Sequence, residues 1–318
     1  MKIVVLDGRT LNPGDNPWTL IEALGELALF EHTPADQILE RARPADILLT
    51  NKTPLTAALL GELPRLKFIS VLATGFNVVD VQAARRRGIP VSNVPVYGTD
   101  SVAQFVLALL LELCHHVGLH DASVKQGDWT RALDFCYWKT PLVELADQTM
   151  GVVGFGRIGQ RVGHLAHALG MKLIAYDVVC GPNPGFAPFR WVSLPDLFSQ
   201  ADVVSLHCPQ TPANQGFVNQ ALLQRMQPHA FFINTARGGL VNEVDLAAAL
   251  NAGTIAGAAV DVVASEPIQP ANPLLRAKNC IITPHQAWAT LSARKRLMQA
   301  TAENIAGFIQ GRPIHVVN

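Results

Sequence analysis

The chain has 318 residues, of which 49% are hydrophobic and 16% are charged, and its formal net charge is zero. Because single hydrophobic cores stop growing near about 250–300 residues, two domains are expected rather than one. The apolar content excludes a disordered chain, and the balanced charge gives no general attraction to nucleic acid or to an anionic membrane.

The first hundred residues alternate short apolar runs with helical patterns. Apolar strands alternating with helices predict a parallel sheet that is covered on both faces. The apolar run at the N-terminus is far too short for a signal peptide, so we expect a cytoplasmic protein. The predicted strands are 2–7, 46–50, 67–73 and 90–94. The predicted helices are 19–27 and 78–88, the second of which is ended by Gly88.

A long helix is expected to begin near Asp100 and to carry the chain into a second array of strands. Its most apolar part, 102–114, is shorter than a membrane span and contains Glu112, which indicates a buried helix. The strands predicted for the second array are 149–155, 171–177, 203–208, 230–236, 256–263 and 280–284.

Two such arrays predict an α/β fold with two doubly wound, Rossmann-like parallel-sheet domains and a cleft between them. The helical pattern at 291–310 follows the last strand of the second array, and we expect it to pack back on the first domain. The predicted domains are therefore residues 1–98 with 289–318, and residues 99–288.

Residues 121–148 fit neither array. This segment is long, has no regular period and contains Trp129, Phe135, Tyr137 and Trp138. Segments of this kind serve as lids or interface arms, although a loop that packs on its own domain explains the composition equally well.

The strongest motif is the run Gly154, Phe155, Gly156, Arg157, Ile158 and Gly159. A GxGxxG pattern alone is a weak signal, but this one follows an apolar strand and opens a predicted helix. Such glycines allow a tight turn and a close approach of the backbone to a pyrophosphate, whose charge the helix N-terminus stabilises. We therefore predict a dinucleotide site here.

Asp177 ends the next predicted strand, 18 positions after Gly159. This spacing is close to that of a carboxylate which accepts hydrogen bonds from the adenosine ribose. A carboxylate there repels a 2′-phosphate, and no arginine follows in Val178, Val179 or Cys180. The sequence therefore predicts NAD(H) as the cofactor in preference to NADP(H).

Charged residues stand at the ends of three later strands. Arg237 follows one strand, Asp261 and Glu266 lie in and just beyond the next, and His285 ends the last. Each residue alone has an ordinary structural role as a surface cation, a local hydrogen-bond acceptor or a loop histidine. Ligands of such sheets bind at the carboxyl ends of the strands. The occurrence of all these charged residues at strand ends therefore predicts a chemical site.

At these residues the sequence resembles the D-isomer-specific 2-hydroxyacid dehydrogenase family. The matching stretches, which extend from about residue 70 to 290, are ATGFNVVD, YGTDSVAQFVLALLLEL, MGVVGFGRIGQ, SLHCPQT, INTARGGLV, DVVASEP and TPHQAWAT. The forms VYGTDSVAQ, DFCYW and TPHQAWATLSARKRLM are most similar to the glycerate dehydrogenase/hydroxypyruvate reductase branch. Phe76 departs from the small residue or tyrosine usual in its loop, and a bulky aromatic ring there would narrow or reshape the substrate pocket.

The resemblance implies roles for the three residues of the chemical site. Arg237 would bind the substrate carboxylate, for which a planar guanidinium is well suited. His285 would be the general acid for reduction of a 2-oxo acid and the base in the reverse direction. Glu266 would hold the imidazole in the required tautomer.

The resemblance also implies binding residues and domain roles. The first domain would be a flavodoxin-like substrate-binding domain, in which Ala73, Thr74 and Gly75 meet the substrate carboxylate. The second domain, 99–288, would bind NAD. Its expected cofactor contacts are the Gly154–Gly159 loop, Asp177, Ser101, Cys208, Pro209, Thr235, Ala236, Arg237, Asp261 and His285.

Residues 121–148 resemble the dimerisation arm of the family, which implies a homodimer in which Trp138 or Phe135 reaches the neighbouring site. No metal is expected, because His116 and His120 lack a completing carboxylate and hydride transfer needs none. The five cysteines are odd in number and contain no CxxC, which argues against a disulfide framework.

The resemblance implies an NAD-dependent enzyme that interconverts hydroxypyruvate or glyoxylate with glycerate or glycolate. A D-3-phosphoglycerate dehydrogenase or another D-2-hydroxyacid dehydrogenase is the alternative within the family, although the substrate loop shows no basic cluster for a phosphate. From a different class, a related fold serves as an NAD-sensing corepressor, which would bind the dinucleotide without turnover. No nucleic-acid or membrane partner is expected.

Overall fold

The computed structural model describes residues 1–318, which divide into two compact units. Unit 1 comprises residues 1–98 and 288–318, and unit 2 comprises residues 99–287. The later boundary lies one residue before the predicted one, because Trp288 belongs to unit 1. There its ring packs edge-on against Tyr97, with the ring centroids 6.1 Å apart.

Unit 1 contains a sheet of five parallel strands in the order β2-β1-β3-β4-β5. This order is that of flavodoxin-like doubly wound sheets, which hold ligands beyond the carboxyl ends of their strands. The strands are β1 (Lys2–Val5), β2 (Glu26–Leu29), β3 (Ile47–Thr50), β4 (Phe68–Val71) and β5 (Val91–Ser92).

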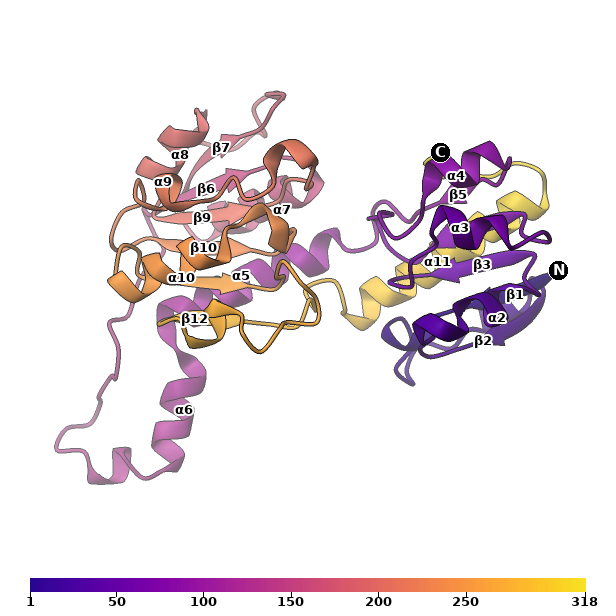
Figure 1. Ribbon diagram of the computed structural model, residues 1–318. Coiled ribbons are helices and arrows are strands. Elements are labelled where there is room, and N and C mark those ends of the chain that lie inside the picture. Colours follow the sequence, from indigo (N-terminus) through magenta and orange to yellow (C-terminus); the bar gives the residue numbers. More distant parts are fainter. The chain divides into compact units, whose positions relative to one another are not determined.

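Helices cover both faces of this sheet because successive strand residues point to opposite sides. Ile3 and Val5 face a layer that includes α1 (Thr19–Glu22) and α11 (Leu291–Ile309), which lies along the sheet in Figure 1. Val4 and Leu6 face the other layer. That layer is formed by α2 (Ile38–Ala42), α3 (Ala57–Gly61) and α4 (Val81–Arg86).

The helix predicted over 19–27 is wrong in its second half. Helix α1 ends at Glu22, and Glu26–Leu29 forms the edge strand β2, which pairs with β1 from Lys2↔Glu26 onward. Gly25 makes this turn possible, since a Cβ there would lie 2.5 Å from the Met1 carbonyl oxygen. Glu, Leu and Ala are helix formers, and pairing with β1 overrides that local preference.

Unit 2 contains a sheet of seven parallel strands in the order β12-β11-β10-β9-β6-β7-β8. The chain reverses direction across the sheet between β6 and β9, and such a switch point is where dinucleotides bind. Strand β8 was not predicted. The strands are β6 (Thr149–Val153), β7 (Lys172–Tyr176), β8 (Phe189–Trp191), β9 (Val203–Leu206), β10 (Phe231–Asn234), β11 (Gly257–Val260) and β12 (Cys280–Ile282).

Two helical layers bury the faces of the second sheet. Helices α5 (Thr99–His115) and α7 (Arg157–Ala168) cover one face with residues such as Leu110 and Val162. The other face is covered by α8 (Leu194–Gln200), α9 (Gln220–Leu223) and α10 (Glu243–Ala252). These three helices lie together on one side of the sheet in Figure 1.

The segment 121–148 starts within helix α6 (Val117–Lys125), passes through a 3₁₀ turn at Trp129–Arg131 and returns as an extended chain. Figure 1 shows α6 and this chain projecting from the rest of unit 2. No single helix of the protein is long and apolar enough to cross a membrane, and α5 and α6 meet that test only as a pair bent by 54°.

Candidate active site

The glycine-rich turn joins β6 to α7 at the switch point of the second sheet. Gly154 has a φ of +87°, which side chains rarely adopt, and a Cβ there would lie 2.5 Å from the Cys208 backbone nitrogen. A Cβ on Gly159 would collide with the Gly154 carbonyl oxygen. These two glycines are therefore required by the protein's own packing.

Gly156 differs from the other two glycines, because a Cβ built on it would meet no protein atom within 4 Å. Gly156 is the N-cap residue of α7, and no side chain caps this helix end. Open space at a glycine beside an uncapped N-terminus of a 12-residue helix suits the close approach of a pyrophosphate. The turn therefore fits a dinucleotide cofactor.

Asp177 comes directly after β7 and is tied to the glycine turn. Its Oδ2 accepts a hydrogen bond from the Phe155 N–H at 2.7 Å, and its Oδ1 accepts one from the Val178 N–H at 2.7 Å. The carboxylate is partly exposed, so it keeps acceptor capacity for a ribose hydroxyl. The carboxylate and the turn thus form one rigid unit.

The residues after β9 form the wall next to this turn. Burial raises the pKa of the Cys208 thiol to about 11, so the thiol is protonated at neutral pH and is not a nucleophile. Burial also lowers the pKa of His207 to about 3, and its Nε2 lies 2.8 Å from the Ser205 hydroxyl. Both side chains are therefore neutral, and Pro209 beyond them is exposed.

Arg237 follows β10, and its position is fixed by Asn234. The Asn234 amide is fully buried, donates to the Arg237 carbonyl oxygen at 2.9 Å and accepts from the Ala236 N–H at 3.0 Å. The Arg237 guanidinium is exposed and makes one bond, to the Ala236 carbonyl oxygen. Most of its donors are therefore available to an anionic ligand.

Thr235 carries a buried hydroxyl that has no hydrogen-bond partner within the protein. Buried polar groups of this kind are rare and call for a ligand or water. Since Thr235 directly precedes Ala236 and Arg237 at the end of β10, this hydroxyl is suited to a polar part of the cofactor.

Asp261 follows β11 and organises the loop that contains His285. Its carboxylate, which is 1% exposed, accepts hydrogen bonds from the Thr283 hydroxyl at 2.7 Å and from the Gln286 and Ala287 N–H groups at 2.9 Å. Its carbonyl oxygen accepts from the His285 N–H at 2.7 Å. A carboxylate has room for about four such bonds, so this loop takes up most of the acceptor capacity of Asp261.

His285 stands in this loop with a φ of +52°, in the left-handed region. A non-glycine residue there costs about 1–3 kcal/mol, and such strain clusters at functional sites. The hydrogen bonds around Asp261 offset that cost. Ser101 of α5 supports the loop's far end, because its hydroxyl donates to the Ala287 carbonyl oxygen at 2.7 Å.

The His285 imidazole pairs with Glu266, which follows β11. Nδ1 of His285 lies 2.7 Å from Oε2 of Glu266, and the two side chains are 26% and 33% exposed. Nδ1 is thereby committed to the carboxylate, which leaves Nε2 as the nitrogen that can exchange a proton with a ligand. Arg237, Glu266 and His285 thus come from the carboxyl ends of three adjacent strands.

In unit 1, the loop Ala73–Gly75 follows β4. The Thr74 hydroxyl donates to the Val94 carbonyl oxygen at 2.8 Å, and Asn93 donates to the Thr74 carbonyl oxygen at 2.7 Å. The backbone N–H groups of the loop donate to no protein acceptor, so they are open to an anion. Phe76 packs partly on the unit 1 core.

Asn234 and Asp7 were missed in the sequence. Asp7 follows β1, and its carboxylate holds the segment Asn51–Thr53 through backbone N–H groups. Asn234 stands in the quoted stretch INTARGGLV, and Asp7 directly follows an apolar strand. The role of Asp7 depends on a loop that only the fold brings to it. The role of Asn234 is local, since an asparagine that ends a strand often bonds to the backbone of the following loop.

A Rossmann-type sheet with an open glycine turn, a hydrogen-bonded His–Glu pair and an exposed arginine at its strand ends is typical of a dinucleotide-dependent oxidoreductase. Comparison with known proteins agrees. The family model "D-isomer specific 2-hydroxyacid dehydrogenase, NAD binding domain" matches residues 107–287.

Three relatives illustrate the similarity. A hydroxypyruvate reductase of Blautia hydrogenotrophica is 49% identical over 321 positions, covering 100% of both chains. A glycerate dehydrogenase of Methylorubrum extorquens is 39% identical, covering 99% of this chain and 98% of the relative. The structure of D-lactate dehydrogenase from Aquifex aeolicus, complexed with NAD and lactic acid, matches with a TM-score of 0.85 at 26% identity, covering 100% of both chains.

The chain belongs to the D-isomer-specific 2-hydroxyacid dehydrogenase family. It is an oxidoreductase with an NAD(P) cofactor, and the family, the enzyme class and the two parallel-sheet α/β domains predicted from the sequence are confirmed.

Proposed function

We propose that this protein uses NADH to reduce a short 2-oxo acid, hydroxypyruvate or glyoxylate, to the D-2-hydroxy acid, and that it catalyses the reverse oxidation. The observation that carries the proposal is the His285–Glu266 pair, at 2.7 Å, in a strained loop at the strand ends beside the Arg237 loop. The relatives named hydroxypyruvate reductase and glycerate dehydrogenase support this choice of substrate.

Arg237 would bind the carboxylate of the 2-oxo acid through its exposed guanidinium. In unit 1, the open N–H groups of Ala73–Gly75 would also suit a carboxylate. His285 would donate the proton from Nε2 to the carbonyl oxygen. Glu266 would keep Nδ1 protonated and would stabilise the imidazolium before proton transfer. A dinucleotide held by the Gly154–Gly159 turn and Asp177 would supply the hydride for the carbonyl carbon.

The cofactor is proposed to be NAD(H) in preference to NADP(H). The Asp177 carboxylate is fixed beside the glycine turn, and a 2′-phosphate placed next to it would meet an uncompensated negative charge. The exposed residues that follow, Val178 and Val179, offer no cation.

The proposal is tested by following NADH absorbance with hydroxypyruvate, glyoxylate, pyruvate, 2-oxobutyrate, phenylpyruvate and 3-phosphohydroxypyruvate. Fast oxidation with hydroxypyruvate or glyoxylate supports it. A preference for a larger or phosphorylated oxo acid would reassign the substrate while leaving the chemistry in place. Tight NADH binding without turnover on any acid would contradict the enzyme and favour a dinucleotide sensor.

The protein is further proposed to be a homodimer that pairs through the arm, residues 121–148. The arm exposes Trp129, Leu133, Phe135 and Trp138, whose exposed fractions run from 52% to 107%. Asp128 makes it rigid by accepting from Ser123 at 2.7 Å and from Lys139 at 2.6 Å. Exposed aromatic groups on a rigid support are typical of an interface.

Light scattering checks this part of the proposal. The wild-type protein is expected to have the mass of a dimer, and Phe135→Asp with Trp138→Asp to have that of a monomer. Val244→Asp, which alters an equally exposed side chain outside the arm, is the matched control. A monomeric wild-type protein would contradict the dimer.

A further inference from the structure

The Asp7 carboxylate accepts hydrogen bonds from three consecutive backbone N–H groups of unit 1. Its Oδ1 accepts from the Asn51 N–H, and its Oδ2 accepts from the Lys52 and Thr53 N–H groups, each at 2.7 Å. Oδ2 also accepts from the Thr53 hydroxyl at 2.9 Å. Three consecutive backbone donors on one carboxylate fix the conformation of Asn51–Thr53.

This segment lies beside the loop whose N–H groups are open to an anion. At one end, the Leu72 N–H donates to the Thr50 carbonyl oxygen at 2.8 Å. At the other end, the Leu55 N–H donates to the Val78 carbonyl oxygen at 2.7 Å. Lys52 is therefore held between two points at which the segments 50–55 and 72–80 run side by side.

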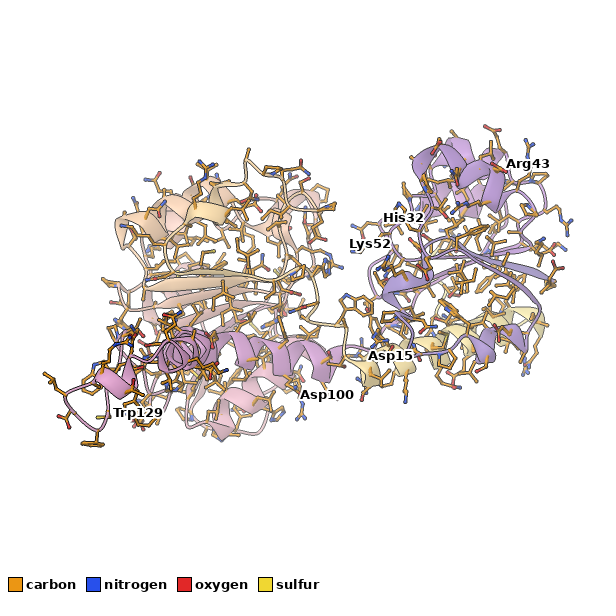
Figure 2. The ribbon with its side chains drawn as sticks, turned by 90° about the horizontal axis from the view of Figure 1, so that it is seen from below. Asp15, His32, Arg43, Lys52, Asp100 and Trp129 are labelled. Atoms are coloured by element: carbon orange, nitrogen blue, oxygen red, sulfur yellow. The ribbon has the colours of Figure 1, made fainter.

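Lys52 is the basic residue of this pair of segments, since 50–55 and 72–80 contain no other lysine, arginine or histidine. Its side chain is exposed, while Asn51 and Thr53 on either side are buried. Figure 2 shows Lys52 at the same end of unit 1 as His32, which follows β2, and far from Arg43. This end is formed by the carboxyl ends of the strands, where such sheets bind ligands.

We propose that Lys52 is a specificity-determining residue that binds an oxygen substituent on C3 of the 2-oxo acid. The inference rests on the proposed function and deepens it. With the substrate carboxylate on the Ala73–Gly75 N–H groups, the ammonium of Lys52 donates a hydrogen bond to the C3 hydroxyl of hydroxypyruvate. Pyruvate has a methyl group at that position and glyoxylate has no C3, so neither can accept this bond.

The chemistry of the segment suits this role. The ammonium has three donors on a flexible stem, so it can reach a small hydroxyl from a fixed backbone. Asp7 is then a positioning residue, because it determines where that stem begins. The prediction is a preference for hydroxypyruvate over pyruvate and glyoxylate.

The test compares kcat/KM for hydroxypyruvate and pyruvate at saturating NADH in the wild-type protein and in Lys52→Met. A charged hydrogen bond to a substrate is worth about tenfold or more in such a comparison. The ratio of the two kcat/KM values is therefore expected to fall about tenfold, mainly through KM for hydroxypyruvate. Asp7→Asn is expected to lower the same ratio in part, and Lys52→Arg to restore part of it.

Arg43→Met is the matched control, since it also removes one exposed positive charge from unit 1 but at the opposite end. It is expected to leave the ratio as in the wild-type protein. Lys52→Gln is measured in parallel, so that either neutral variant carries the comparison if the other unfolds.

An unchanged ratio in the Lys52 variants, with a wild-type protein that reduces hydroxypyruvate, would refute the role of Lys52 alone. An equal loss with both substrates would also refute it, because that result indicates general attraction of anions. A wild-type protein that reduces no 2-oxo acid would overturn the proposed function and this inference together.

Discussion

The carboxylate of Glu266 lies 2.7 Å from Nδ1 of His285, and the two residues come from the loops after β11 and β12. A carboxylate at Nδ1 selects the tautomer in which Nε2 can act on a ligand and stabilises the charged imidazole. This geometry supports the proposed role of the pair, which is to deliver a proton from one defined nitrogen, Nε2.

Glu266→Gln should lower kcat for oxo-acid reduction by about 10²–10⁴-fold, because an amide stabilises the imidazolium poorly and permits the wrong tautomer. The affinity for NADH, measured by fluorescence titration, should change little. If kcat stays near the wild-type value, Glu266 has no part in orienting the acid.

Substitutions of Gly154 and Gly156 should separate the stability of the turn from its binding of the cofactor. Gly156→Ala should leave the Tm unchanged, because its Cβ meets no protein atom, yet should weaken NADH binding by about tenfold or more. Gly154→Ala should instead lower the free energy of unfolding by about 1–3 kcal/mol, because of its φ of +87° and its contact with Cys208. Normal NADH affinity in the Gly156→Ala protein would show that the pyrophosphate binds away from this glycine.

Asp177→Asn should reduce the preference for NADH over NADPH by about tenfold, since it removes the negative charge but keeps an acceptor oxygen for the Phe155 N–H. The measurement is kcat/KM for each cofactor with one oxo acid. A wild-type protein that prefers NADPH would contradict the assigned role of this carboxylate.

His207 should make the protein less stable in mild acid. Burial lowers its pKa to about 3, whereas an unfolded chain protonates near the ordinary value of about 6.5. Between these values the unfolded state binds one proton more than the folded state. The free energy of unfolding therefore decreases as the pH is lowered, by at most about 1.4 kcal/mol per pH unit. Urea denaturation of His207→Asn at pH 5 and pH 7 should show a smaller pH dependence than the wild-type protein; an equal dependence would contradict this origin.

Most of the strands and the long helices α5, α7 and α11 could be predicted from the sequence, because continuous apolar runs and long helical periods are strong signals. Strand β2 could not, since its four residues favour a helix and only the neighbouring β1 makes them a strand. Strand β8 is a three-residue edge strand, which gives too short a pattern to recognise.

The candidate site likewise has features that could be predicted from the sequence and features that could not. Arg237, Glu266 and His285 could be placed at strand ends from the sequence, and their roles remain proposals. The bonds of Asp261 to 283–287, of Asn234 to the Arg237 loop and of Asp7 to 51–53 join segments up to 46 residues apart. No local pattern encodes the contacts of Asp261 and Asp7, because they depend on which loops the parallel sheets bring together. The bonds of Asn234 are local, and asparagine commonly makes such bonds where a strand turns into a loop.

The most direct test of the account is single-turnover oxidation of NADH with hydroxypyruvate by His285→Asn, compared with the wild-type protein. Asparagine tolerates the left-handed φ of +52° and keeps the loop intact while removing the acid. We expect the rate of the chemical step to fall by about 10²-fold or more, with NADH affinity retained. A chemical step that remains as fast as in the wild-type protein would show that another group donates the proton.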